Sequence, residues 1–305
     1  MKILLHKISL FGKNFRGHPL RSAKGLKSSP IFIIGSGRSG NTLMRAILVA
    51  QGDIVIPPES YVLGALIKEY RIMNFIPWRI LSRLVISKFA SHPEFPTWEF
   101  NVAPLYQKAL TLGNERRNLA SLIELIYHTY GDENLGGGSR WGDKTPLNTY
   151  HLSEIHKVFP NAFYIHMIRD GRDVVSSYLK SGIYSDLGEA CQRWSESIDL
   201  ARNFAQKIQK SHYIEVRYEA LVSDPEPTIK SICKFLGVPY NDEMMKPEVV
   251  ASLLGDTGRL HHEGVHRPIN TDSIGKWKTR LSPERQKEAE ILLRHKLIQL
   301  EYEKD

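Results

Sequence analysis

The apolar pattern of the chain begins with a short run that ends at a glycine-rich turn, and a helical pattern follows directly. The run "PIFIIG" at 30–35 is rich in β-branched residues and follows a proline, which predicts a buried strand. "NTLMRAILVAQG" at 41–52 spaces its apolar residues as a helix face does and ends at a glycine. Strand, loop and helix in this order predict the first unit of a doubly wound α/β sheet.

The alternation of strands and helices continues along the chain. Apolar runs predict three more strands, at 53–58, 161–168 and 212–221. Amphipathic stretches predict four more helices, at 173–182, 187–210, 223–237 and 282–293. We therefore predict a mostly parallel central sheet flanked by helices. In such a sheet the ligand loops follow the carboxyl ends of the strands, where the turns 35–42, 57–60 and 169–173 fall.

Residues 61–140 interrupt this alternation with a mostly helical pattern. Prolines break the pattern at four points, namely Pro77, Pro93, Pro96 and Pro104. We expect a helical insertion that covers or gates a site, within a single domain that spans 30–305.

The net charge of the chain is concentrated at its N-terminus. The formal charge is +8, but the first 30 residues hold seven of the 41 Lys and Arg and none of the 33 Asp and Glu. The rest of the chain is therefore close to balanced, which argues against a nucleic-acid partner. We predict that residues 1–29 form a flexible basic tail. Its apolar patches offer a second hypothesis, peripheral contact with an anionic membrane.

Cysteine usage and hydropathy indicate a cytoplasmic protein. Cys191 and Cys233 lie among apolar neighbours and form no C-x-x-C pair, so we predict buried thiols in a reducing compartment. No run approaches the roughly 18 apolar residues of a membrane-spanning helix. His6 and Lys7 break the apolar N-terminus, which makes it a poor secretory signal. The histidines form no H-E-x-x-H pattern, and we expect no metal.

The loop "GSGRSGNT" at 35–42 has the spacing of a phosphate-binding loop without its lysine. Gly35, Gly40 and Thr42 fit G-x-x-x-x-G-K-[ST], but Asn41 stands at the lysine position. In a nucleoside-triphosphate site that lysine reaches the β- and γ-phosphates. The backbone N–H groups from Gly37 to Thr42 still form an anion cradle, and Arg38 adds a planar fork of donors. The loop thus suits a single phosphate with a group attached.

"GSGRSGNTLMRAIL" resembles the 5′-phosphosulfate loop of sulfotransferases, and most of all that of tyrosylprotein sulfotransferases and their bacterial relatives. The resemblance implies a P-loop-like fold. It rests on five consecutive residues: Arg38, Ser39, Gly40, Asn41 and Thr42. Asn41 departs from the usual threonine, but its amide can also donate to a phosphate.

Three further segments resemble the same family. In "MIRDGRDVVSSYLKSG", Arg169 and Ser177 match the pair that holds the 3′-phosphate of the nucleotide. "RPINTDSIGKWKTRLS" resembles the C-terminal loop that folds over the nucleotide, with Ser273, Lys276 and Trp277 as the matching residues. Tyr218 falls where the family places a tyrosine near the nucleotide, and it equally suits a core aromatic residue at a strand end.

The resemblance implies sulfuryl transfer from 3′-phosphoadenosine 5′-phosphosulfate (PAPS) to a hydroxyl group by in-line attack, without a metal. It implies that Glu59 is the base and Lys144, in the turn "WGDKTP", is the cation on the bridging oxygen, a role that Arg38 shares. Cytosolic members of the family use histidine, so the runner-up bases are His261, His262 and His266.

The acceptor is not determined by these motifs. Aromatic residues and arginines in 61–140, the expected acceptor side, favour a carbohydrate or glycolipid acceptor, with protein tyrosine as the alternative. Two readings from other classes stay open. One is an atypical P-loop kinase or NTPase, in which Asp170 would bind magnesium, and the other is a non-catalytic nucleotide-binding module.

Overall fold

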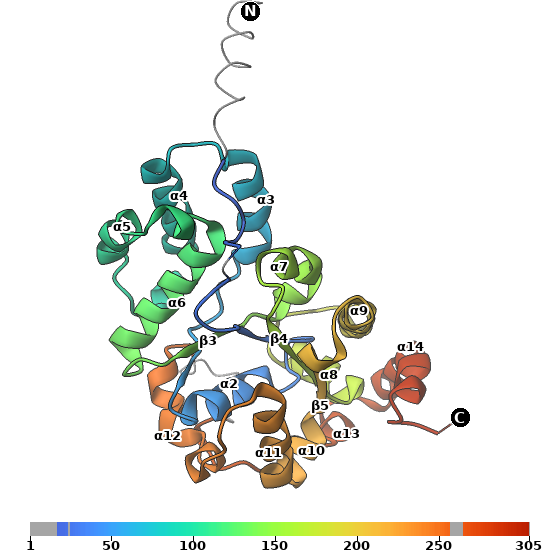
Figure 1. Ribbon diagram of the computed structural model, residues 1–305. Coiled ribbons are helices and arrows are strands. Elements are labelled where there is room, and N and C mark those ends of the chain that lie inside the picture. The colour runs from blue at the N-terminus through green and yellow to red at the C-terminus, as the bar shows by residue number, and fades with distance from the viewer. Residues whose placement is uncertain (1–16, 24, 257–264, 305) are drawn as a thin grey trace, which may run out of the picture.

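The computed structural model describes residues 17–23, 25–256 and 265–304 (Figure 1). Its centre is a five-stranded sheet in which every neighbouring pair is parallel. The strands lie in the order β2 (Ile54–Val55), β3 (Arg140–Lys144), β1 (Ile31–Ile34), β4 (Phe163–Ile168) and β5 (Tyr213–Arg217). The predicted fold class, a parallel α/β sheet flanked by helices, is confirmed.

Strand β1 is apolar at every position because helices cover both faces of the sheet. Phe32 and Ile34 belong to a core that includes the helices between residues 63 and 158, whereas Ile31 and Ile33 belong to a second core with the helices at 41–50 and 225–236. This alternation follows from the two-residue period of a strand.

Thirteen α-helices are assigned in the described residues. They are α2 (Asn41–Ala50), α3 (Leu63–Met73), α4 (Trp78–Ala90), α5 (Ala103–Leu110), α6 (Leu119–Asn134), α7 (Leu152–Val158), α8 (Gly171–Lys180), α9 (Leu187–Ala205), α10 (Tyr218–Ser223), α11 (Pro225–Leu236), α12 (Glu248–Ala251), α13 (Trp277–Arg280) and α14 (Pro283–Gln299). None of the helices in this part of the chain is both long and apolar enough to span a bilayer.

The helical pattern predicted for 61–140 is confirmed by α3–α6, which lie together on one side of the sheet (Figure 1). Aromatic side chains fill the space between these helices and the sheet. Trp98 contacts Tyr127 and Tyr130 edge-on, with ring centroids 5.6 and 5.5 Å apart, and Tyr127 lies 4.7 Å from Trp141 of β3. Such rings bury much apolar surface, so the insertion is firmly packed on the sheet.

Strand β3 was not predicted, because its sequence "RWGDK" is mostly polar. The sequence predicts a turn at Lys144, whereas the structure places this residue at the end of a strand between β2 and β1. All five residues are buried, and the charged side chains of Arg140, Asp143 and Lys144 each have specific partners. Residue patterns detect strands by their apolar positions, so a buried polar strand escapes them.

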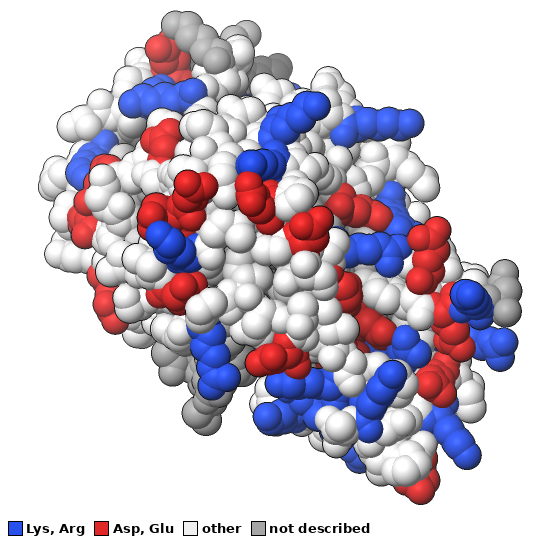
Figure 2. All heavy atoms as spheres, turned by 90° about the horizontal axis from the view of Figure 1, so that it is seen from below, with Lys and Arg blue, Asp and Glu red and all other residues white. Residues whose placement is uncertain are grey.

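Charged side chains of both signs are spread over the surface of the body. Figure 2 shows acidic and basic residues interspersed over most of one face, with a group of Lys and Arg near its lower edge. This mixture agrees with the nearly balanced charge of the chain beyond its first 30 residues.

Candidate active site

A cleft of about 940 Å³ opens at the carboxyl end of the sheet. Segments that follow four of the strands contribute to its wall: the loop after β1, Glu59, Arg169 and Tyr218. Residues between 265 and 280 form a further part of the lining. Open parallel sheets bind their ligands at this edge, so the cleft is the candidate active site.

The loop after β1 turns sharply into α2. Gly35 and Gly40 have φ angles of 120° and 93°, which glycine adopts readily, and Arg38 has a φ of 65°. Helix α2 begins at Asn41, and both Asn41 and Thr42 line the cleft. The first N–H groups of a helix lack partners within it, so this end of α2 can bind an anion.

Asn41 closes the loop instead of reaching out as a lysine would. Its Nδ2 donates a hydrogen bond of 2.8 Å to the carbonyl of Ser36. The hydroxyl oxygens of Ser36 and Ser39 lie 2.8 Å apart, and both serines are buried. The Ser39 side chain therefore supports the loop from inside.

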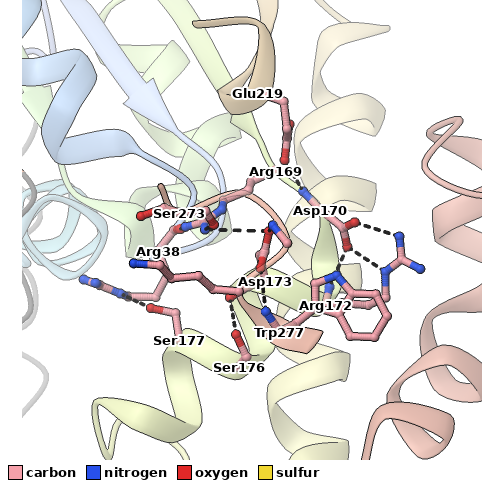
Figure 3. A network of polar contacts seen from close by, with 12 residues as sticks. Arg38, Arg169, Asp170, Arg172, Asp173, Ser176, Ser177, Glu219, Ser273 and Trp277 are labelled. Carbon is pink, nitrogen blue, oxygen red and sulfur yellow. Dashed lines mark hydrogen bonds and ion pairs between the residues drawn. The ribbon is translucent and has the colours of Figure 1, made fainter. Parts of the chain in front are cut away.

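Two arginines meet at the predicted phosphate end of the cleft (Figure 3). Arg38 Nε donates to Ser177 Oγ at 3.0 Å, and Arg169 Nη1 donates to the carbonyl of Arg38 at 3.0 Å. The Nη2 of Arg169 donates to the carbonyl of Ser273. Burial, and then the charge of Arg169, lower the pKa of Arg38. An anion bound between them would relieve this repulsion.

The carboxylate of Asp173 lies near Arg169, at a distance too long for a hydrogen bond. Asp173 Oδ2 is 3.8 Å from Arg169 Nη2. Its oxygens accept hydrogen bonds from the N–H groups of Gly275 (2.7 Å) and Trp277 (2.9 Å). Asp173 therefore fixes the C-terminal loop to α8, and this contact places Ser273 and Lys276 on the cleft wall.

Trp277 and Tyr218 have different positions. The Trp277 indole is buried beside α8 and α14, with the Arg172 guanidinium 4.6 Å from a ring centroid, and it does not line the cleft. The Tyr218 ring lines the cleft, and the guanidinium carbon of Arg169 lies over it, 4.5 Å from the ring centroid. A Cβ on Gly40 would lie 2.6 Å from Tyr218 Cδ2, so this ring also packs closely against the loop.

Asp170, the magnesium ligand of the kinase reading, is occupied by other contacts. Its carboxylate accepts from the N–H of Arg172 at 2.9 Å, as the N-cap of α8, and from the Arg172 guanidinium at 2.7 and 3.0 Å. Among the described residues, no three His, Cys, Asp or Glu side chains are arranged to hold a metal ion.

The part of the cleft formed after β2 holds Glu59, paired with Lys144. Glu59 follows β2 and the prolines 57 and 58, and its Oε1 lies 2.6 Å from Lys144 Nζ. The Lys144 side chain is fully buried and does not line the cleft, whereas Glu59 does. The predicted base and the predicted cation thus touch each other, with the carboxylate on the cleft side.

Two residues that the sequence analysis missed extend this pair. Asp256 Oδ2 lies 3.4 Å from Lys144 Nζ, and its Oδ1 accepts from the buried guanidinium of Arg45. Arg45 also donates to the carbonyls of Ile56 (2.8 Å) and Leu254 (2.9 Å). The four charges alternate in sign from Arg45 to Glu59. Arg45 interrupts the apolar run "LMRAIL", and that charge among buried helix positions was the available signal.

A second polar network lies beneath Lys144. Asp143 accepts hydrogen bonds from the hydroxyls of Tyr127 (2.5 Å) and Ser60 (3.0 Å) and from Asn148 Nδ2 (2.7 Å). Burial raises the pKa of Asp143, and hydrogen bonds from Tyr127, Thr145 and Ser60 counteract that effect. The network joins α6, β3 and the residue after Glu59, and it fixes the backbone that carries Glu59 and Lys144.

Of the three runner-up histidine bases, His266 lies within the described residues. His261 and His262 lie outside the described residues. His266 is exposed and does not line the cleft, although its neighbour Arg267 does.

Comparisons with known proteins agree with this arrangement. The sequence model of the sulfotransferase family matches residues 30–242. Protein-tyrosine sulfotransferase A of Caenorhabditis elegans is 28% identical over 264 residues, which cover 82% of this chain and 62% of that protein. The protein-tyrosine sulfotransferase of Drosophila melanogaster is also 28% identical, over 81% of this chain and 46% of its own length. The chain thus spans about half to two thirds of these relatives.

Two solved structures share the fold. The sulfotransferase domain of the Synechococcus PCC 7002 olefin synthase superimposes with a TM-score of 0.56 at 21% identity, over 90% of this chain and 95% of that domain. The sulfotransferase domain from the curacin biosynthetic pathway gives a TM-score of 0.54 at 22% identity, over 87% and 97%. Since the family model covers well over half of the sequence, the chain belongs to the sulfotransferase family.

Proposed function

We propose that this protein transfers the sulfuryl group of PAPS to a hydroxyl acceptor, and that the acceptor is the phenolic hydroxyl of a tyrosine in a peptide or protein. One observation carries the proposal. A concentration of positive charge, Arg38 with Arg169, and a carboxylate, Glu59, line the same cleft, and the charge of Glu59 acts on Arg38. A nucleotide phosphosulfate needs the first, and an attacking hydroxyl needs the second.

In this proposal, different residues bind the two phosphate-bearing ends of the nucleotide. The N-terminus of α2 and Arg38 hold the 5′-phosphosulfate, and Arg169 with Ser177 hold the 3′-phosphate. Ser273 and Lys276 approach from the C-terminal loop that Asp173 fixes. The Trp277 side chain supports this loop from the core, a structural role beside the nucleotide role that the resemblance implies.

Glu59 removes the acceptor proton as the hydroxyl oxygen attacks sulfur. A new S–O bond forms to the acceptor while the S–O bond to the 5′-phosphate breaks, and 3′-phosphoadenosine 5′-phosphate (PAP) leaves with the bonding electrons. Arg38 stabilises the charge that develops on the leaving phosphate. Lys144 lies behind Glu59 in the structure, so its first task is to orient this carboxylate, and the bridging-oxygen role requires it to move past Glu59.

A phenolic acceptor suits this base better than a sugar alcohol. A tyrosine hydroxyl has a pKa near 10, so a carboxylate removes its proton more readily than that of an aliphatic alcohol. The relatives named above are protein-tyrosine enzymes, and neither name supports the carbohydrate or glycolipid acceptor predicted from the sequence. Tyr61, Leu147 and Tyr184 line the cleft and offer apolar contacts to a phenol ring.

Calorimetry with PAP in the presence of EDTA tests the nucleotide assignment. We expect metal-independent binding that Arg169→Ala weakens by about 30-fold or more, because the charge-assisted contacts to a phosphate are lost. Arg294→Ala, at an exposed position of α14, is the matched control and should bind as the parent does. Magnesium-dependent ATP binding in place of PAP binding would replace the proposal with a kinase or NTPase.

Transfer of labelled sulfate from PAPS tests the acceptor assignment. A tyrosine peptide should be sulfated, its phenylalanine analogue should not, and Glu59→Gln should abolish the transfer. Sulfation of a glycan or glycolipid in preference to the peptide would return the acceptor to the carbohydrate prediction. PAP binding without transfer to any of these hydroxyls would identify a binding module.

A further inference from the structure

The helical hairpin of α3 and α4 exposes apolar side chains that the cleft does not use. Four large ones are Ile72 (73% exposed), Phe75 (62%), Ile80 (52%) and Leu84 (42%). They fall within 13 residues, at the end of α3, in the connection and on α4. None of them lines the cleft. We call these four residues and the basic residues among them the α3–α4 surface.

Helix α4 is apolar on its outer side as well as its inner side. Leu81 and Val85 are buried in the core, one residue after the exposed Ile80 and Leu84. Residues four apart lie next to each other on a helix, so Ile80 and Leu84 form an outward stripe. A surface helix of a soluble domain ordinarily presents polar residues on that side, and an exposed apolar group of this kind marks a contact site.

The charges of the hairpin are strongly asymmetric. Residues 63–90 contain a single acid, Glu69, and five basic residues, Lys68, Arg71, Arg79, Arg83 and Lys88. The acid is paired with Lys88 at 2.7 Å, and Arg71 contacts Glu154 at 3.3 Å. Arg79 and Arg83 are exposed and precede Ile80 and Leu84 by one residue, so they edge the apolar stripe.

The described chain begins against the same hairpin. His18 donates its backbone N–H to the carbonyl of Asn74 at 2.7 Å, and its ring lies 5.0 Å from Trp78. Figure 1 shows the chain entering the body beside α3 and α4. The sequence that precedes this point, residues 1–16, contains four basic residues, no acid and several apolar residues.

We propose that the α3–α4 surface docks the protein on an anionic phospholipid bilayer. The apolar residues enter the interface, while Arg79 and Arg83 face the lipid phosphates. Packing of residues 1–16 onto the hairpin would also cover the apolar group. It would, however, bring the basic residues of that segment beside Arg79 and Arg83. An anionic lipid surface instead complements the positive charge of the segment and of the hairpin.

Vesicle co-sedimentation of the full chain tests the apolar contribution. The protein should bind phosphatidylserine-containing vesicles, and it should bind phosphatidylcholine vesicles at least about tenfold more weakly at low salt. The double variant Ile72→Ser/Phe75→Ser should reduce the binding about tenfold or more. The matched control, Val249→Ser/Ile291→Ser, changes two comparably exposed apolar residues on α12 and α14 and should bind as the parent does.

A second pair of variants tests the charges. Arg79→Glu/Arg83→Glu should abolish the preference for anionic vesicles, whereas Arg285→Glu/Lys287→Glu, the same charge change at exposed positions of α14, should retain most of it. Unaltered melting temperature and PAP affinity establish that each variant is folded.

Three results would overturn the proposal. The first is equal binding to both kinds of vesicle. The second is loss of binding on deletion of residues 1–16 with none on hairpin substitution, which would assign binding to those residues alone. The third is a dimer in solution that Ile72→Ser/Phe75→Ser converts to monomer, which would assign the surface to a second copy.

Discussion

The two ends of the cleft hold charge in opposite ways. At the end formed after β1 and β4, Arg38 and Arg169 lie together, and Asp173, 3.8 Å from Arg169, is committed to two backbone N–H groups. At the end formed after β2 and β3, Glu59 and Lys144 belong to a row of alternating signs. The first end is arranged for an anion, and the second is neutral without one. A cleft can thus be charged for binding at one end and balanced for proton transfer at the other.

The largest effect is expected at the balanced end, from Glu59→Gln. The amide keeps the size of the side chain but cannot accept the acceptor proton, so kcat should fall by about 10²–10⁴. PAP affinity should change less than about threefold, because the role proposed for Glu59 is toward the acceptor. Steady-state kinetics with a tyrosine peptide and calorimetry measure the two quantities, with Glu133→Gln at an exposed position of α6 as the control. A parallel loss of PAP affinity would mean that Glu59 also contributes to nucleotide binding, and the two ends would then not have separate functions.

Arg38→Lys tests the charged end. A lysine keeps the charge but lacks the planar fork that bonds Ser177, so kcat should fall by about 10²-fold. PAP binding should weaken by about tenfold or less, since Arg169 stays in place. An activity close to that of the parent would mean that charge alone, without the geometry of the fork, serves this end.

Asp256→Asn interrupts the alternating row. Of the four charges, Arg45, Lys144 and the carboxylate of Glu59 then remain. Because breaking a buried ion pair is strongly destabilising, the free energy of unfolding should fall by about 3 kcal/mol. Lys144 should then bind Glu59 more tightly, and kcat should fall by about tenfold because that carboxylate becomes a poorer base.

A double-mutant cycle with Arg45→Met checks this reading of the row. The stability losses of Asp256→Asn and Arg45→Met should be clearly less than additive in denaturant titrations, since the two residues share one contact. Full additivity would show that the row is not a unit.

The smallest effect concerns stability beneath the charged end, at His166 of β4. Burial lowers the pKa of His166, and the nearby Glu215 partly counteracts this effect. The unfolded chain therefore takes up this proton first as the pH falls below about 6.5, and the native state loses stability there. The melting temperature should fall between pH 7.5 and 5.5, and by less in His166→Gln than in His295→Gln, an exposed control. Equal pH dependence in the two variants would exclude His166 as the source.

The charged end could be predicted from sequence because its residues sit in short motifs. Arg38 and Asn41 belong to one loop, and Arg169 and Ser177 are eight residues apart across a strand end and the next helix. The structure brings both groups into one cleft, while their roles toward the nucleotide stay predictions.

The balanced end could be predicted only in part. Glu59 and Lys144 were chosen by resemblance, but their direct contact was not expected, because β3 reads as a polar turn. Asp256 comes from a segment far along the chain, and no local pattern joins it to Arg45 or Lys144. Tertiary contacts between distant charges leave little trace in periodicity or spacing.

The attachment of the C-terminal loop has a consequence for how its sequence can change. Asp173 recognises the loop through the N–H groups of Gly275 and Trp277, which almost every amino acid possesses. Gly275, with a φ of 71°, favours glycine, and position 277 excludes proline. Under these two restrictions the side chains between 270 and 276 are free to diverge while the loop keeps its place. Substitutions in this loop can therefore change the side chains that face the proposed nucleotide site while the hydrogen bonds that hold the loop stay in place.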